Sequence, residues 1–323
     1  MAILHTDSYP GPPWYQINGH WQTILPALRG PKVGFRRERL ELDDGDFLDL
    51  DWLQNKGNRS LVILTHGLEG NSRRPYMRSA ARFFHARGWD ALAWNCRSCS
   101  GEMNRLFRFY HHGEIEDIHR VTTYALQQKD YQEVVLIGYS MGGAMTTKYL
   151  SVHSPDLPDV IRGGIAFSSP FDLEASVDAL ELPGNELYKT RFMKQLGEKF
   201  RIKDQRFPGK LDMEKLDKIE TWKQFDEWFT APILGVDSAQ EFYDLASAKN
   251  FVSTLSRPVL AVSALNDPII TEACLPLEEA KDHPFLTLEL TPDGGHVGFS
   301  LRKNKHSWME ERAWQEILKW REN

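Results

Sequence analysis

Three side chains of the types needed for nucleophilic acyl transfer occur along the sequence in the order serine, aspartate, histidine. Ser140 lies in the segment GYSMG at residues 138–142, which fits the pattern G-x-S-x-G. A serine hydroxyl is a weak nucleophile unless a base accepts its proton, and His296 is the candidate base. Asp267 would hold the imidazole in one tautomer and stabilise the imidazolium. Together the three residues predict catalysis through a covalent acyl-enzyme.

The segments around Ser140 predict the turn that such a nucleophile requires. Residues 134–137 form a short apolar, β-branched run, typical of a buried parallel strand, and residues 144–150 indicate the start of a helix. The glycines two positions before and after the serine would permit a sharp, strained turn. The pentapeptide alone could arise by chance, but the order strand, turn, helix favours the functional interpretation. The turn would also direct the Met141 amide at a developing oxyanion.

A second oxyanion donor is predicted after another strand. Residues 61–65 form an apolar run that ends in HGLEG at residues 66–70. Enzymes with this type of serine turn place their second donor in an H-G-x-x-G segment after a strand, and the Leu68 amide is the candidate. The Leu68 and Met141 amides would stabilise a tetrahedral intermediate, each contributing roughly 3 kcal/mol.

The acid and the base are also predicted to follow strands. Strand patterns at residues 257–263 and 285–291 precede Asp267 and His296, and functional groups of open α/β sheets collect at the carboxyl edge. Alternatively, Asp267 caps the following helix and His296 is an ordinary loop residue. Asp293 is a rival acid, but the two glycines between it and His296 indicate that it shapes a tight turn.

The order of the remaining patterns predicts an α/β fold. From residue 172 to residue 255 helical patterns and polar turns dominate, which is too long for an ordinary crossover. Residues 1–35 are rich in proline, glycine and aromatic residues, which indicates an irregular arm. We predict one domain over residues 1–323, with a mostly parallel sheet flanked by helices and a helical cap inserted at about 172–255. Further strands are expected at 38–42, 47–52, 89–95 and 161–168, the first two as a hairpin, and helices at 76–87, 114–128, after Asp267 and at 306–320.

The composition argues against several classes of function. The 39 basic and 45 acidic side chains give a formal charge of −6, so no nucleic-acid partner is expected. No apolar run approaches the ~18 residues of a membrane span, and the first residues lack the features of a signal peptide. The three cysteines are an odd number without a disulfide framework, which indicates a reducing, cytoplasmic compartment.

Two groups of potential metal or redox ligands have plainer interpretations. Cys96 and Cys99 form a C-x-x-C segment, but no second cysteine or histidine pair completes a zinc set, so structural loop cysteines are expected. His112, Glu116 and His119 could share one face of a helix. The same residues also fit a loop followed by a helix start with acids in its first turn, which we favour. No metal or organic cofactor is expected.

The sequence as a whole resembles a known family. It is similar to proteins of the α/β-hydrolase fold, and in particular to the YheT-like branch that includes abhydrolase domain-containing proteins one and three. Members often carry phenylalanine and leucine where this chain has Tyr139 and Met141, both variable positions of the serine motif. The matching segments are GHWQT at 19–23, HGLEGN at 66–71, NCRSCSGE at 95–102, FYHHG at 109–113, GYSMGG at 138–143 and GGHVGF at 294–299.

The resemblance implies hydrolysis of carboxylic esters, lipid esters among them. Combined with the three candidate residues, it predicts a serine esterase that acts on small-molecule esters without a cofactor. Thioesterase, acyltransferase or perhydrolase activity on the same residues is an alternative. A binding protein on a hydrolase scaffold is an alternative of another class, because a fold alone does not prove activity.

Overall fold

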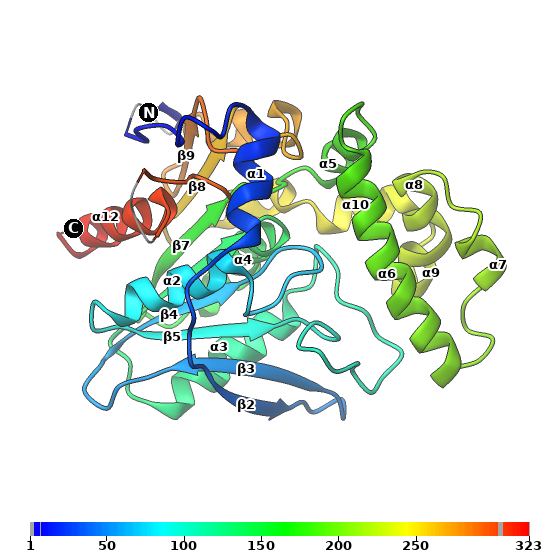
Figure 1. Ribbon diagram of the computed structural model, residues 1–323. Coiled ribbons are helices and arrows are strands. Elements are labelled where there is room, and N and C mark those ends of the chain that lie inside the picture. The colour runs from blue at the N-terminus through cyan, green and yellow to red at the C-terminus, as the bar shows by residue number, and fades with distance from the viewer. Residues whose placement is uncertain (1–2, 7, 303–305, 323) are drawn as a thin grey trace.

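The computed structural model describes residues 3–6, 8–302 and 306–322. A nine-stranded sheet lies at its centre, in the order β1-β9-β8-β7-β6-β4-β5-β3-β2 (Figure 1). Neighbouring strands are parallel except for β2 with β3 and β3 with β5, so the mostly parallel sheet predicted from the sequence is confirmed. The strands are β1 (Ile3–His5), β2 (Arg36–Glu41), β3 (Phe47–Leu53), β4 (Ser60–Thr65), β5 (Asp90–Asn95), β6 (Glu133–Tyr139), β7 (Ile161–Phe167), β8 (Val259–Ala264) and β9 (Leu286–Thr291).

Helices cover both faces of the sheet. Along β6, Leu136 packs in the apolar cluster with α3 and α4, whereas its neighbour Val135 packs in the cluster with α2 and α12. This alternation is the two-residue period of a strand, and burial on both faces explains why the strand is continuously apolar. None of the helices in the described ranges has both the length and the apolar character needed to cross a membrane. The four helices are α2 (Pro75–His85), α3 (Glu116–Gln128), α4 (Met141–Val152) and α12 (Trp308–Glu322).

The chain between β7 and β8 is helical, as expected for residues 172–255. In Figure 1 most of these helices, the long helix α6 among them, lie together at one side of the sheet. We call residues 173–254 the helical segment. It contains α5 (Leu173–Leu180), α6 (Glu186–Arg206), α7 (Met213–Leu216), α8 (Trp222–Phe225), a π-helical turn η2 (Asp226–Thr230), α9 (Ala231–Leu234), α10 (Ala239–Ala246) and the 3-10 helix η3 (Ala248–Thr254).

Aromatic rings join the helical segment to the rest of the molecule. Phe200 of α6 packs against Phe225 and Phe229, with ring centroids 5.3 and 5.4 Å apart. From the other side, Phe109 of the loop before α3 approaches Phe200 to 4.5 Å. Contacts of this kind add to the stabilisation from apolar burial. The position of α6 is therefore fixed by packing from both directions.

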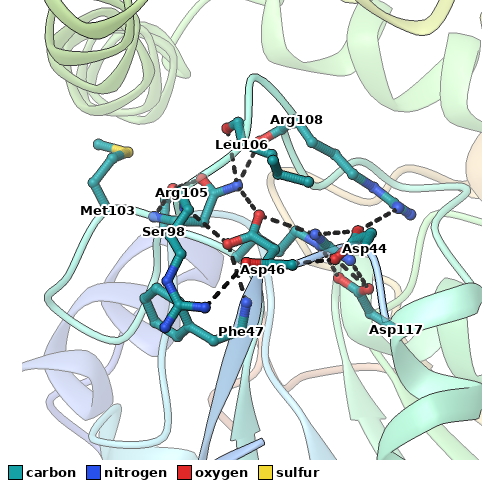
Figure 2. Close-up of polar contacts among 12 residues, drawn as sticks. Asp44, Asp46, Phe47, Ser98, Met103, Arg105, Leu106, Arg108 and Asp117 are labelled. Atoms are coloured by element: carbon teal, nitrogen blue, oxygen red, sulfur yellow. Dashed lines mark hydrogen bonds and ion pairs between the residues drawn. The ribbon is translucent and has the colours of Figure 1, made fainter. Parts of the chain in front are cut away.

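A buried ionic network holds the loop that follows β5 (Figure 2). Arg97 is 3% exposed and pairs with Asp117 at 2.8 Å and with Asp46 at 3.0 Å. Figure 2 shows Asp46 and Asp117 directed at the same centre. A buried charge is tolerated only when it is paired, and here the pairing fixes the loop. Lys203 of α6 donates to the Asn104 carbonyl of this loop at 2.9 Å, which connects the helical segment to it.

The expected hairpin and the other expected strands are present within a few residues of their predicted bounds, but two expectations were wrong. Residues 1–35 are not an irregular arm throughout: β1 pairs with β9, and α1 (Gly19–Leu28) forms a helix. Its N-cap Asn18 accepts a hydrogen bond from the Trp21 amide at 3.0 Å, a signal that the proline and glycine content obscured. The helix expected after Asp267 is reduced to η4 (Glu272–Cys274) and the single turn α11 (Leu277–Ala280).

Candidate active site

Ser140 occupies a strained turn between β6 and α4. Its backbone angles are φ 54° and ψ −127°, which non-glycine residues rarely adopt. The Ser140 amide donates to the Phe167 carbonyl of β7 at 2.8 Å, and its carbonyl accepts from the Gly143 amide at 2.9 Å. Strain of this kind costs on the order of 1–3 kcal/mol and persists only where the surroundings impose it. The turn that the sequence predicted is therefore present.

The glycines of the serine motif are required by close backbone approach. A Cβ atom on Gly138 would lie 2.1 Å from the Gly142 carbonyl oxygen. A Cβ atom on Gly142 would lie 2.3 Å from the Thr65 carbonyl oxygen of β4. Neither contact is possible for a larger residue without moving backbone, so the pattern G-x-S-x-G is a packing requirement here.

His296 lies between Ser140 and Asp267, although the three residues are distant in the sequence. Its Nε2 atom is 2.9 Å from the Ser140 Oγ atom, and its Nδ1 atom is 2.9 Å from Asp267 Oδ2. Because a carboxylate only accepts hydrogen bonds, Nδ1 carries the hydrogen and Nε2 is left to accept the serine proton. The other carboxylate oxygen, Oδ1, accepts from the Ile269 and Ile270 amides at 2.8 and 3.0 Å, which fixes its orientation.

Asp293, the rival acid, does not contact the imidazole. Its Oδ1 atom accepts from Gln22 Nε2 at 3.0 Å and from Asn266 Nδ2 at 2.8 Å. The two glycines after it have positive φ angles of 153° and 59°, which makes the tight turn expected from the sequence. Asp293 therefore braces the loops that carry Asp267 and His296.

No role was predicted for Gln22 and Thr23 of α1, yet both support the His296 loop. Thr23 Oγ1 accepts from the His296 amide at 2.8 Å and donates to the Gly19 carbonyl at 2.6 Å. Gln22 Oε1 accepts from the Gly294 amide at 2.7 Å. These two residues could have been noticed because the segment GHWQT at 19–23 resembles the family. That resemblance does not say what the residues do.

The two predicted backbone donors border the serine turn. Leu68 lines the same cavity as Ser140, and a Cβ atom on the preceding Gly67 would lie 3.0 Å from the Ser140 Cβ atom. Met141 is the first residue of α4, where an amide has no acceptor within the helix. Within the described ranges, neither amide donates a hydrogen bond. Both are therefore free to bind an oxyanion.

His66 fixes the start of the loop at residues 66–70. Its Nε2 atom accepts from the Cys96 amide at 3.1 Å, so Nδ1 carries the hydrogen and donates to the Gly67 carbonyl at 2.8 Å. Burial lowers the pKa of His66 to about 4, and the ring is neutral near pH 7. The motif H-G-x-x-G contains this histidine, but nothing in the pattern indicates that its ring holds the loop in place.

A cavity of about 1100 Å³ opens beside Ser140 and His296. Its walls come from α1, the start of α2, the start of α6 and the His296 loop. This is large enough for a small organic ligand, and apolar walls with few polar groups are usual for such sites. The apolar lining includes Ile24, Leu25, Leu187, Phe192, Ile269 and Leu301.

A second cavity, of about 60 Å³, lies between the helical segment and the loop carrying Leu68. Its lining includes the rings of Phe109, Phe200 and Phe225, together with the carboxyl group of Asp226. Leu68 lines both cavities, so the loop beside the serine separates them.

The other potential ligand groups stay apart from this site. Over the described parts of the chain, no three His, Cys, Asp or Glu side chains are arranged to hold a metal ion. Cys96 and Cys99 are buried free thiols. Glu116, the acid of the second group, begins α3, as the helix-start interpretation predicted, and His119 stacks on His153 with ring centroids 4.4 Å apart.

Comparison with known proteins establishes the family. A family model described as alpha/beta hydrolase fold matches residues 60–302. The chain belongs to this family. It is 32% identical over 304 residues to the putative esterase YheT of Escherichia coli, covering 91% of this chain and 88% of that protein. It is 28% identical over 309 residues to phospholipase ABHD3 of Mus musculus, covering 91% of this chain and 74% of that protein.

Solved structures show the same fold. The Pyrococcus furiosus esterase Pf2001 superposes with a TM-score of 0.59 at 17% identity, covering 90% of this chain and 97% of that chain. Est1E of Butyrivibrio proteoclasticus superposes with a TM-score of 0.55 at 15% identity, covering 89% and 99%. The α/β-hydrolase fold and the family predicted from the sequence are both confirmed.

Proposed function

We propose that this protein is a serine hydrolase that cleaves carboxylic esters through an acyl-enzyme, with Ser140, His296 and Asp267 as the catalytic triad. The observation that carries the proposal is the continuous hydrogen-bonded chain from the Ser140 hydroxyl through the His296 ring to the Asp267 carboxylate, with 2.9 Å at both steps. Relatives named esterase, phospholipase and monoacylglycerol lipase support an ester as the substrate.

In the first half-reaction His296 Nε2 accepts the Ser140 proton while the serine oxygen attacks the ester carbonyl. The imidazolium then donates its proton to the leaving alcohol, and an acyl-enzyme remains. Water repeats the sequence in the second half-reaction and releases the acid. Asp267 stabilises the imidazolium in both, and its own orientation is held by two backbone amides. None of these steps requires a metal or an organic cofactor.

The negative charge of each tetrahedral intermediate would be stabilised by the Leu68 and Met141 amides. Each such donor typically contributes roughly 3 kcal/mol to the transition state. Both amides lie beside the serine turn and are free to donate. The strain at Ser140 supports this role, since a turn that exposes the hydroxyl also directs the next amide toward the same space.

We further propose that residues 1–323 form one domain in which the insertion at about residues 172–255, which contains the helical segment, acts as a cap over the active site. Tyr188 and Phe192 of α6 line the large cavity, so the segment would contact the substrate. The volume and apolar walls of the cavity fit a small-molecule ester with a lipid-like chain. Three free, buried cysteines support a reducing, cytoplasmic location.

The test is hydrolysis of a panel of p-nitrophenyl esters of graded acyl length, combined with a fluorophosphonate probe. We expect turnover by the wild type, a loss of at least ~10³-fold in Ser140→Ala, and a probe adduct on Ser140. Ser151→Ala is the matched control, because the Ser151 hydroxyl only donates to the Thr147 carbonyl within α4. An adduct on another residue, or full turnover by Ser140→Ala, would contradict the proposal.

A further inference from the structure

Basic side chains gather at the large cavity. The acid in its described lining is Glu310, which is 2% exposed, and burial raises the pKa of its carboxyl group. The cavity is therefore cationic, although the whole chain has a formal charge of −6. The arginines of the lining are Arg29, Arg74, Arg82 and Arg191.

These arginines differ from most others in the protein because they lack acidic partners. Arg37, for example, binds both oxygens of Asp51, and Arg97 binds Asp117 and Asp46. In the described ranges, by contrast, no ion pair joins any of the four cavity arginines to a carboxylate. Among the residues that the structure describes, the Arg74 guanidinium contacts the Glu69 carbonyl, at 2.5 Å, and no carboxylate.

Arg74 and Arg191 line the same cavity as the serine. Arg74 is the N-cap of α2 and Arg191 belongs to α6, so two separate helices contribute them to one cavity. Burial and the positive charge of Arg74 lower the pKa of Arg191. Tyr76, two positions after Arg74, accepts a hydrogen bond from the Gly67 amide at 3.1 Å, and Gly67 touches the serine turn. Tyr76 and Gly67 thus connect the start of α2, where Arg74 lies, to the serine turn.

Two guanidinium groups held together without a counter-ion repel each other, and a bound anion would offset that cost. The planar guanidinium donates two parallel hydrogen bonds to a carboxylate or a phosphate, which makes arginine the usual residue for these groups. Arg74 is partly buried and Arg191 is exposed, and both line the cavity that holds Ser140 and His296.

We propose that Arg74 and Arg191 form an anion subsite beside Ser140, and that the ester substrate carries an oxyanionic group, a carboxylate or a phosphate, which binds there. The inference rests on the proposed esterase function and narrows its substrate class. The oxyanionic group comes either from a carboxylate at the far end of the acyl chain or from a phosphate on the alcohol.

The experiment compares two pairs of esters, and in each pair one member carries an anionic group that its neutral counterpart lacks. For the acyl side, the pair is the mono-4-nitrophenyl ester of adipic acid and its methylated, neutral counterpart. For the alcohol side, the pair is 1-hexanoylglycerol 3-phosphate and 1-hexanoylglycerol. The measured quantity is the ratio of kcat/KM for the anionic ester to that for the neutral ester, in the wild type and in Arg191→Gln. Arg201→Gln is the control, because Arg201 lies on the same helix but pairs with the exposed Asp217.

We expect the wild type to prefer the anionic member of at least one pair, and Arg191→Gln to reduce that preference about tenfold, the scale of one lost charge-assisted hydrogen bond. The pair that shows the preference identifies the source of the charge. Arg201→Gln should keep the wild-type ratio. Turnover without a charge preference, or a preference that Arg191→Gln leaves intact, overturns the subsite alone. Absence of turnover on all four esters overturns the esterase function and the subsite with it.

Discussion

Lys199 of the helical segment donates a hydrogen bond to the Glu69 carboxylate at 2.7 Å, and both side chains are largely buried, with 14% and 5% exposed. Glu69 follows Leu68, the proposed oxyanion donor, and has a positive φ of 51°. Its amide donates to the Tyr110 hydroxyl at 2.9 Å, and that hydroxyl donates back to the Glu69 carboxylate. A strained residue persists when its surroundings hold it, so Lys199 connects α6 to the loop that carries the donor.

Lys199→Met should lower kcat and leave KM nearly unchanged. Without Lys199 the Glu69 carboxylate keeps the Tyr110 hydroxyl but loses its charged partner, which costs about 3 kcal/mol in a buried setting. The loop would relax to solvate the carboxylate, and the Leu68 amide would leave its position. Full loss of one oxyanion donor costs ~10²–10³-fold in kcat, so we expect at least ~10-fold from a displaced one. Steady-state kinetics on one p-nitrophenyl ester measure the effect.

A second substitution separates positioning from general loss of stability. Glu69→Gln in the Lys199→Met background removes the unpaired charge, so it should restore most of kcat. Lys189→Met is the control on the same helix, because Lys189 contacts Glu181 and the Glu220 carbonyl rather than the loop. If kcat does not recover in the double variant although its thermal unfolding is normal, Lys199 does not act through Glu69.

Asp267→Asn should reduce kcat far more than Asp293→Asn. Asparagine at position 267 can offer its amide group to Nδ1 of His296, which favours the tautomer that cannot accept the Ser140 proton. In serine proteases the corresponding substitution reduces kcat on the order of 10⁴-fold, and we expect a loss of at least ~10²-fold here. Asp293 only joins Gln22 to Asn266, and its asparagine variant should keep kcat within ~10-fold. A larger loss in Asp293→Asn than in Asp267→Asn, with both variants natively folded, would require a different acid.

Local patterns made part of this site predictable. The serine turn is specified by an apolar strand and glycines within five residues, and Asp267 and His296 could be placed by the rule that functional loops follow parallel strands. The hydrogen bonds that hold these loops in place were not predictable, because no pattern in the neighbouring sequence marks the residues that form them. The bond from Thr23 to His296 spans 273 residues, and the one from Lys199 to Glu69 spans 130. Each depends on how α1 and α6 pack, which periodicity alone does not determine.

Thr23→Val should slow catalysis by loosening the His296 loop. Valine has nearly the shape of threonine but cannot accept the hydrogen bond from the His296 amide, which would leave that amide without its partner. A misplacement of His296 by a fraction of an ångström weakens proton transfer from Ser140, and we expect a loss of about 10-fold in kcat. Thr23→Ser keeps the hydroxyl and is the matched control. Equal losses in the valine and serine variants would show that the methyl group, rather than the hydroxyl, matters.

Asp226→Asn should stabilise the protein more at pH 8 than at pH 5. Asp226 is buried in the helical segment, where the Thr230 and Tyr243 hydroxyls donate to its carboxyl group at 2.6 and 3.1 Å. Burial raises its pKa to about 7. The unfolded chain loses the proton near pH 4, but the folded protein keeps it until about pH 7. Between these values the unfolded state binds fewer protons, so wild-type stability falls as the pH rises.

An asparagine side chain does not ionise in this pH range. The stability of the variant therefore does not fall with rising pH in the way that wild-type stability does. The gap in unfolding free energy between Asp226→Asn and wild type should widen by about 3 kcal/mol from pH 5 to pH 8. Thermal unfolding of both proteins in matched buffers at the two pH values measures the gap. Asp130→Asn is the control, because the Asp130 side chain is 88% exposed and its gap should stay constant. A constant or narrowing gap for Asp226→Asn would mean that the carboxyl group is ionised in the folded protein throughout this range.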